Sequence, residues 1–385
     1  MKKVIILAAF FATSAFCFAQ KPQPVYSIIR QVQNFDWYEE QAKAWKHEID
    51  NGTTNPMAWV YWNEANRMAA NFCNEYEKWK SKNGSYFMPQ DSILKSAETH
   101  IPNTFEYYFL KMRYEDNRNV DKEVFNYWLF KAQEIRPYDD LLFPFLLNYY
   151  LFKDDKPNIE FTCKKWFESN EIPMEILTTL YNMLISLDKN AILLVNGDND
   201  TYPCWVLQNA KNIRPDVLVM NISLACGVPQ YRKNIFAENE IKPLKNDLNY
   251  VTNQELIKHL IENIKNRPIY MSAFVGQNVY KEYENKMYHT GLAFKYSEKP
   301  FNNLEVLRDN VENKFLLDFL KESFYTTHSQ TVINIFKASH LSMFLQLYNH
   351  YKQTGKTDKA QKIKELSIAI AKNSEWSEWL NYFEK

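Results

Sequence analysis

Three prolines that follow similar helical phrases constrain the fold of this chain most. Pro102, Pro137 and Pro173 lie about 35 residues apart, and each ends an amphipathic stretch: "LKSAETHIP", "LFKAQEIRP" and "KWFESNEIP". A proline disfavours helical geometry in the residue before it but is tolerated in the first turn of the next helix. The sequence therefore predicts that a new helix begins at or just after each proline, with no strand between residues 90 and 187.

A helix-turn-helix unit that repeats near every 34 residues with a proline at the junction resembles the tetratricopeptide repeat. Such helices cannot bury their apolar faces alone, so they stack as antiparallel pairs into a solenoid whose concave side commonly receives a peptide or protein. The segment "GTTNPMAWVYWNEANRMAANF" around Pro56 indicates a further, divergent pair. We predict a tetratricopeptide-like helical domain over residues 20–187. An irregular helical bundle with coincidental proline spacing is the alternative.

The hydrophobic pattern changes near Asn190. Short apolar runs at 191–195, 216–223 and 268–275 are separated by helical patterns at 202–213 and 253–266. Strand, helix, strand, helix, strand is the order of a parallel sheet with crossover helices. We therefore predict a small parallel, Rossmann-like α/β domain over residues 188–300, to which "GLAFKYS" at 291–297 adds an edge strand. The fold class is α plus α/β.

The helical period returns after the predicted sheet. The stretch Leu341–Asn373 places Tyr348, Tyr351, the turn residue Gly355 and the small Ala360 at tetratricopeptide-like intervals. This spacing predicts a closing helical hairpin within a C-terminal helical domain over residues 301–385.

The first residues, "MKKVIILAAFFATSAFCFAQ", have the layout of a secretory signal peptide: two lysines, a short apolar run and small residues. We expect residues 1–19 to be removed, so that the mature chain begins at Gln20 and is periplasmic or otherwise exported, and soluble. A lipid anchor on Cys17 is the rival interpretation, but Phe16 stands where a small residue is needed. No later stretch has the length of a membrane-spanning helix.

The charge balance gives no reason to expect nucleic acid or an anionic membrane as a partner. Lysine and arginine together number 46, as do aspartate and glutamate, so the formal net charge is zero. The four cysteines of the mature chain form no CxxC or Cys/His spacing, so we expect buried small residues with at most one disulfide and no zinc site. They are Cys73, Cys163, Cys204 and Cys226.

The stretch "NGDNDTYPCW" is the local motif that suggests a site. It follows the apolar run 191–195, so it is expected at the carboxyl end of a parallel strand, where ligands of open α/β sheets bind. The candidate binding residues are Asn196, Gly197, Asp198, Asn199, Asp200, Thr201, Tyr202 and Trp205.

Two interpretations of this loop remain open. In the structural one, glycine permits a tight turn and Asp200 or Thr201 caps the following helix. In the functional one, Asp198 and Asp200 hold Mg²⁺, Mn²⁺ or Ca²⁺, or bind sugar hydroxyls, while Tyr202 and Trp205 offer ring faces to a sugar or peptide. We expect mainly the structural role, with no required cofactor and a divalent cation as the possible exception.

Other catalytic patterns are missing from the sequence. It contains no GxSxG, Walker or GxGxxG phrase, and its seven histidines form no HxH or HxxxH pair. His289 lies just before "GLAF", where it can approach the mouth of the sheet, although a loop histidine is the simpler interpretation. We therefore assign no catalytic residue.

Three phrases, "NGDNDTYPCWVLQNAKNIRPDVLVMNISL", "GLAFKYS" and "LRDNVENKF", stand in this order before a tetratricopeptide-like end. Together they resemble the soluble C-terminal part of the bacterial membrane glycosyltransferases related to transmembrane protein 260 and to protein O-mannosyltransferases. The resemblance covers about 190–373. In that family the transfer chemistry is expected in the membrane-embedded N-terminal half, for which this chain has a signal peptide and helical repeats instead.

These observations favour an exported, non-catalytic binding or scaffold protein of the bacterial cell envelope. Its partner would be an envelope protein or glycoprotein, engaged by the helical repeats and the α/β domain together. The alternative is a glycan-acting enzyme, or an accessory subunit of a glycosyltransferase, that uses the NGDND loop. An enzyme needs titratable groups that converge in one pocket, whereas a scaffold needs a groove.

Overall fold

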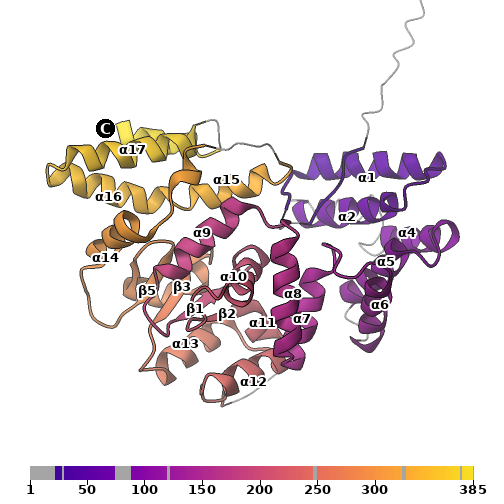
Figure 1. Cartoon of the computed structure of the whole chain (residues 1–385), viewed down its shortest axis with the longest axis horizontal. Helices are drawn as coiled ribbons and strands as arrows, with labels where there is room; N and C mark the ends of the chain where they lie inside the picture. The colour runs from indigo at the N-terminus through magenta and orange to yellow at the C-terminus, as the bar shows by residue number, and fades with distance from the viewer. Residues whose placement is uncertain are drawn as a thin grey trace, which may run out of the picture. The chain divides into compact units, whose positions relative to one another are not determined.

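A computed structural model describes residues 22–27, 30–73, 88–118, 122–245, 249–322, 327–372 and 375–384. Within them the chain is mostly helical, with a small mixed sheet of five strands (Figure 1). No helix in these ranges has both the length and the apolar composition needed to span a bilayer. The predicted signal peptide, including Cys17, lies outside the described residues. The chain divides into two compact units, which are described separately: 22–25 with 34–102, and 26–33 with 103–384.

The first unit contains helices α1 (Phe35–Asp50), α2 (Met57–Phe72) and α4 (Met88–His100). Helix α1 packs against α2, and α2 begins directly after Pro56, as the divergent pair predicted there requires. The Asn34 side chain caps α1 by accepting the Trp37 N–H. The Trp59 indole N–H donates to the Ser96 hydroxyl at 3.0 Å and so joins α2 to α4.

The second unit opens with five helices: α5 (Phe105–Arg118), α6 (Lys122–Ile135), α7 (Phe143–Lys153), α8 (Lys156–Glu168) and α9 (Met174–Ile185). Helix α9 starts immediately after Pro173 and α5 starts shortly after Pro102. Pro137 is followed by a turn before α7, because Tyr138 has a φ of 58° and takes the chain out of helical geometry. The described residues between 90 and 187 contain no strand, as predicted.

The prediction of successive helix pairs holds for the first two pairs and fails for the third. Helix α5 packs against α6, and α7 against α8, but α9 packs against α10 (Asp198–Lys211) and α15 (Gln330–Ala338). Helix α9 buries side chains over more than half of its circumference, among them Glu175, Ile176, Leu177 and Asn182. A helix of this kind belongs inside a core and not at the end of a stack of repeats.

The sheet has the strand order β2-β1-β3-β5-β4. Its strands are β1 (Ile192–Val195), β2 (Leu218–Asn221), β3 (Ile269–Ser272), β4 (Met287–His289) and β5 (Ala293–Tyr296). Strand β1 pairs in parallel with β2 and β3, with Leu193 opposite both Val219 and Tyr270. The three predicted strands and their parallel order are therefore present, and β1 is buried throughout.

Two expectations about this sheet were wrong. The sheet is mixed and not parallel, because β5 runs antiparallel to both β3 and β4. The segment 291–297 supplies β5, which lies between β3 and β4 instead of at the edge. The edge strand β4 is three residues long, and a tight turn at Gly291 (φ 149°) joins it to β5. A Cβ at Gly291 would lie 3.0 Å from the Phe315 ring, so a larger residue would displace this ring and would be strained at this positive φ.

Crossover helices and a C-terminal helical group complete the second unit. Helix α10 connects β1 to β2, and α11 (Ile222–Gly227), α12 (Pro229–Glu238) and α13 (Asn253–Asn263) lie between β2 and β3 in the chain. The last helices are α14 (Asn303–Asp309), α15, α16 (Leu341–Gln353), α17 (Thr357–Ala371) and α18 (Leu380–Glu384). Helices α16 and α17 form the predicted hairpin, with Gly355 (φ 68°) at its turn and Ala360 buried.

Candidate functional site

The NGDND loop connects the carboxyl end of β1 to the start of α10. Gly197 is the N-cap residue of α10, and Asp200 occupies the third helical position. The Asp200 carboxylate accepts the Gly197 N–H at 2.9 Å and the Asn196 N–H at 3.4 Å. We expected Asp200 or Thr201 to be the cap itself. Instead, the Asp200 side chain reaches back to the residue that begins the helix, which is the acidic half of a capping box.

Asp200 is enclosed by the protein. Its exposure is 2 %, and besides the two backbone donors it has a hydrogen bond with the hydroxyl of Ser272, the last residue of β3. Burial raises the pKa of this carboxyl to about 6, although its hydrogen-bond donors act in the opposite direction. A metal ion or sugar would have to displace these internal partners to reach the Asp200 oxygens.

Two further side chains at the carboxyl ends of the strands complete this polar cluster. Asn221, which ends β2, donates to the Thr201 hydroxyl at 2.8 Å and accepts the Leu224 N–H at 2.8 Å. The Ser223 hydroxyl donates to the Asn196 side-chain oxygen at 3.1 Å. The sequence pattern did not indicate Asn221, Ser223 or Ser272, although each lies within or at the end of an apolar run. The cluster ties the ends of three parallel strands together.

Both aromatic candidates are engaged inside the protein, and Trp205 also lines the cleft described below. Tyr202 and Trp205 are each 6 % exposed. The Tyr202 hydroxyl accepts a hydrogen bond from Asn148 of α7 at 2.9 Å, and the Trp205 indole N–H donates to the Val219 carbonyl at 3.1 Å. Gln208 donates likewise to the Val217 carbonyl at 2.7 Å. Since β2 is an edge strand, these side chains satisfy backbone groups that would otherwise lack a strand partner.

The remaining candidates lie nearer the surface. Gly197 and Asp198 are exposed, and Asn196 and Asn199 are half-buried. Within the described ranges, no group of three or more His, Cys, Asp or Glu side chains is placed to hold a metal ion. The four cysteines of the described residues, Cys73, Cys163, Cys204 and Cys226, are all free thiols in the structure.

His289 belongs to the edge strand β4, and not to a loop at the mouth of the sheet. It is buried, its ring stacks on Phe294, and its Nδ1 lies 2.8 Å from the side-chain amide of Gln346. Burial lowers the pKa of His289 to about 4, so the ring is neutral at physiological pH. These contacts give the histidine a packing role between β4 and α16.

We expect the melting temperature of the parent protein not to change with Ca²⁺, Mn²⁺ or Mg²⁺, because Asp200 is already fully occupied by internal donors. Replacing Asp198 by Asn should cost only about 0.3–1 kcal/mol, the usual contribution of an acidic side chain to the first turn of a helix. Thermal melts of the parent and of Asp198→Asn at several ion concentrations test both statements. An ion that stabilises the parent and not the variant would establish a metal site here.

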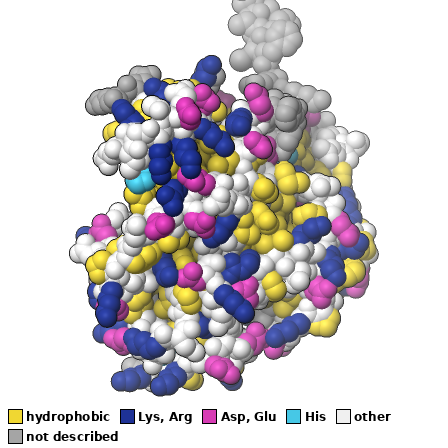
Figure 2. Space-filling view, turned by 60° about the vertical axis from the view of Figure 1, so that its left-hand side comes forward, with side chains coloured by type: hydrophobic (Ala, Val, Ile, Leu, Met, Phe, Trp, Pro, Cys, Tyr) yellow, Lys and Arg dark blue, Asp and Glu magenta, His cyan; other side chains and the backbone are white. Residues whose placement is uncertain are grey.

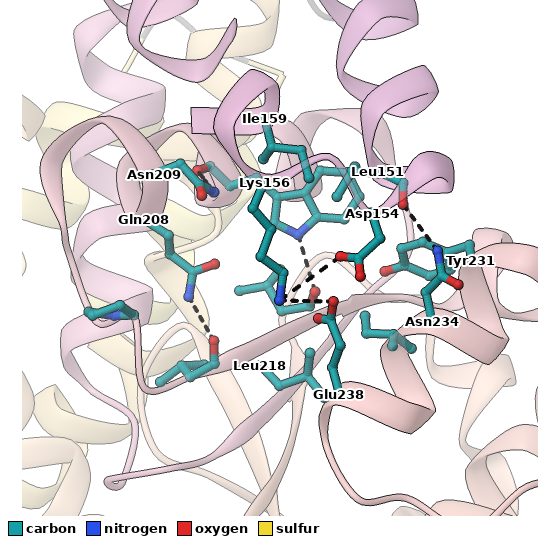
Figure 3. Close-up of a pocket in the computed structure, with 15 residues that line it drawn as sticks. Leu151, Asp154, Lys156, Ile159, Gln208, Asn209, Leu218, Tyr231, Asn234 and Glu238 are labelled. Carbon is teal, nitrogen blue, oxygen red and sulfur yellow. Dashed lines mark hydrogen bonds and ion pairs between the residues drawn. The ribbon is translucent and has the colours of Figure 1, made fainter. Parts of the chain in front are cut away.

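A cleft of about 230 Å³ lies where helices α7 and α8 meet the α/β elements (Figure 3). Leu151 and Ile159 line it from the helical side, and Asn209 of α10, Leu218 of β2 and Ile235 of α12 line it from the α/β side. The two sides are joined by Asn234, whose amide donates to the Phe152 carbonyl at 3.2 Å. The cleft is therefore built from both parts of the second unit.

Three charged side chains meet in this cleft (Figure 3). The Lys156 ammonium lies 3.0 Å from a Glu238 oxygen and 4.0 Å from an Asp154 oxygen. Burial, together with a hydrogen bond to Asp154, raises the pKa of Glu238, and the hydrogen bond to Glu238 raises that of Lys156. Asp154 is the C-cap residue of α7 and has a φ of 55°. This left-handed geometry starts the sharp turn that leads into α8. The cleft thus offers apolar walls and a compact charged group to a ligand.

Fold and site together define a mostly helical protein with a mixed α/β sheet, a polar cluster at the strand ends and a cleft beside the sheet edge. Residues 177–227 match the family model described as TMEM260-associated domain 2. This segment runs from within α9 through β1, α10 and β2 to the end of α11, so it contains the NGDND loop. No curated protein and no solved structure matches the chain.

Proposed function

We propose that this protein is an exported, non-catalytic binding protein of the bacterial cell envelope. It engages an envelope protein or glycoprotein at the cleft between α7–α8 and the α/β elements. The observation that carries the proposal is the composition of this cleft, which helical and α/β residues line together and to which the solvent-accessible Lys156, Asp154 and Glu238 contribute. Concave, mostly apolar sites with a few polar groups are where proteins bind ligands.

The internal hydrogen bonds of the NGDND loop argue against a catalytic role for its side chains. Catalysis needs groups that can reach a reacting atom, whereas Asp200, Thr201, Tyr202 and Trp205 are directed to internal partners. The alternative is a glycan-acting enzyme or an accessory subunit of a glycosyltransferase. It has one observation in its favour, the pKa of Asp200 near 6, which suits an acid–base group, but the burial of this carboxyl opposes it.

The charge distribution favours a protein or glycan over nucleic acid as the partner. Acidic and basic side chains are interspersed over most of the face that Figure 2 shows. Nucleic-acid-binding proteins usually carry a coherent basic surface. The formal net charge of this chain is zero, which does not favour such a surface.

We further propose that the helices α5–α8 are a divergent tetratricopeptide-like array. Residues 190–373 would correspond to the soluble C-terminal part of membrane glycosyltransferases related to transmembrane protein 260, without their membrane-embedded catalytic part. The family match at 177–227 supports this relation for the region around the NGDND loop.

Filling the cleft with a large side chain should weaken partner binding. Asn209→Trp places a large side chain in the cleft from α10, and we expect it to weaken the captured interaction by roughly tenfold or more. The measurement is quantitative mass spectrometry after affinity capture of the tagged protein from its native envelope. Lys211→Trp, at an exposed position of the same helix that does not line the cleft, is the matched control. Equal capture by both variants would place the binding surface elsewhere.

A further inference from the structure

A second cavity, of about 340 Å³, lies between the start of α13 and the loop that follows β3. This loop contains two short 3-10 helices, Gln277–Val279 and Lys281–Lys286. Six polar side chains line the cavity: Gln254, Asn278, Tyr280, Lys281, Glu282 and Tyr283. Its volume falls at the lower end of the range of small-molecule sites, roughly 300–1,000 Å³.

The walls of this cavity are held in place by the fold. Thr252 and Glu255 form a reciprocal capping box that fixes the first turn of α13, and Gln254 belongs to that turn. The Tyr280 ring lies 6.2 Å from that of Phe294 in β5, and the Tyr283 ring meets Tyr296 edge-on. The site is therefore built before a ligand arrives, which limits the entropy that binding costs.

Ile257 and Val279 give this cavity an apolar lining. Ile257 is 1 % exposed and belongs to α13, and Val279 is 7 % exposed and ends the first of the two 3-10 helices. Both side chains are fixed in the core, and they form the apolar part of a lining whose polar groups reach the solvent.

Three polar side chains of this cavity face solvent. Across the described part of the chain, the exposed side chains of Gln254, Asn278 and Lys281 make no hydrogen bond or ion pair with another residue. The cleft between α7–α8 and the α/β elements, called the junction cleft below, differs because its amide side chains Gln208 and Asn234 already donate to backbone carbonyls. The donors and acceptors of these exposed side chains are accessible to a polar ligand, which would replace the water that solvates them.

We propose that this cavity binds a neutral saccharide unit. Lys281 and Glu282 carry opposite charges, so the lining has no net charge and does not favour an anion or a cation. Two amides and two phenols add donors and acceptors in a mixed arrangement, which matches the hydroxyls of a sugar. The tyrosine rings and the apolar lining suit its C–H faces. The inference does not rest on the function proposed for the junction cleft.

Saturation-transfer difference NMR with maltose, methyl α-mannoside and N,N′-diacetylchitobiose tests this site, followed by calorimetric titration of each sugar that binds. We expect at least one of them to bind the full-length mature protein. The double variant Gln254→Ala/Lys281→Ala, which removes one group from each wall, should weaken it by roughly tenfold or more. Tyr283→Phe should keep the ring and lose less affinity.

The controls separate this site from others and from misfolding. Lys258→Ala on α13 and Asn285→Ala on the loop are exposed positions outside the cavity, and both should bind like the parent. Thermal melts check that each variant is folded, and Asn209→Trp in the junction cleft should leave saccharide binding unchanged. Absence of saturation transfer from all three sugars, or unchanged binding by the folded double variant, would overturn the proposal. Tighter binding of inorganic phosphate than of any sugar would overturn it as well.

Discussion

Replacing Arg214 by Ala is expected to lower the free energy of unfolding by about 3 kcal/mol or more, since several hydrogen bonds to one charged group are lost together. The guanidinium donates to the carbonyls of Leu184 at 2.9 Å, Leu187 at 2.8 Å and Asp188 at 2.7 Å. It also holds both carboxylate oxygens of Asp216, at 2.8 and 2.9 Å. The variant would leave carbonyls at the end of α9 without their donor.

Chemical denaturation of the parent and of Arg214→Ala measures this effect. Arg214→Lys is the informative second variant, because lysine keeps the charge but cannot reproduce the planar fork, and we expect it to recover only a minor part of the loss. Arg308→Ala is the control, since this arginine makes a single 3.5 Å contact with Glu305 near the surface. A loss for Arg214→Ala that is no larger than the loss for Arg308→Ala would show that α9 is held by apolar packing alone.

Arg214 also connects elements within the matched segment 177–227. This span contains the arginine, its carbonyl partners at the end of α9, and Asp216 just before β2. Asn182 extends the connection, because its side chain both donates to the Leu316 carbonyl and accepts the Leu316 N–H. The segment that matches a known domain is thus the part of the chain where a helix, two parallel strands and a crossover helix are fixed to one another by polar contacts.

The sequence predicted the parallel part of the sheet because the pattern there is local. Continuous apolar runs such as 191–195 mark strands that are buried on both faces, and helical patterns between them imply crossovers. The antiparallel part was missed for the opposite reason. Strand β4 is three residues long and half-exposed at its start, so it leaves no periodic signal, and its pairing with β5 depends on a turn at Gly291.

The NGDND loop was harder to predict from the sequence than the strands were. We expected the helix to begin near Tyr202, where the helical pattern 202–213 starts. The helix begins at Asp198 instead, with Pro203 inside it, and the contact between Asp200 and Gly197 stabilises its start. The roles of Tyr202 and Trp205 depend on Asn148 and Val219, which are distant in the chain. No local pattern could distinguish a ring that binds sugar from one that covers a sheet edge.

The pH dependence of stability should change when Asp200 is replaced by Asn. The pKa of Asp200 is raised from 3.8 to about 6 in the folded protein, mainly by burial. Between pH 3.8 and about 6 the folded state keeps the Asp200 proton that the unfolded state releases. The stability that the protonated carboxyl contributes is therefore fully present below pH 3.8 and is lost as the pH rises through about 6. A shift of about two units corresponds to about 3 kcal/mol. Asn cannot ionise, and its side-chain oxygen can still accept the Gly197 N–H.

The measurement is the free energy of unfolding of the parent and of Asp200→Asn from pH 4 to pH 7.5. We expect the difference, variant minus parent, to increase with pH in favour of the variant by up to about 3 kcal/mol and to level off above pH 6. Other perturbed groups, such as Glu171 with a raised pKa and His340 with a lowered one, titrate in both proteins and cancel in the difference. Asp200→Ala should show the same trend but lie about 1 kcal/mol lower at every pH, because the acceptor for the first N–H of the helix is lost. A difference that stays constant across this range would mean that Asp200 titrates normally, and the enclosed carboxylate at the centre of the NGDND loop would have to be in contact with water.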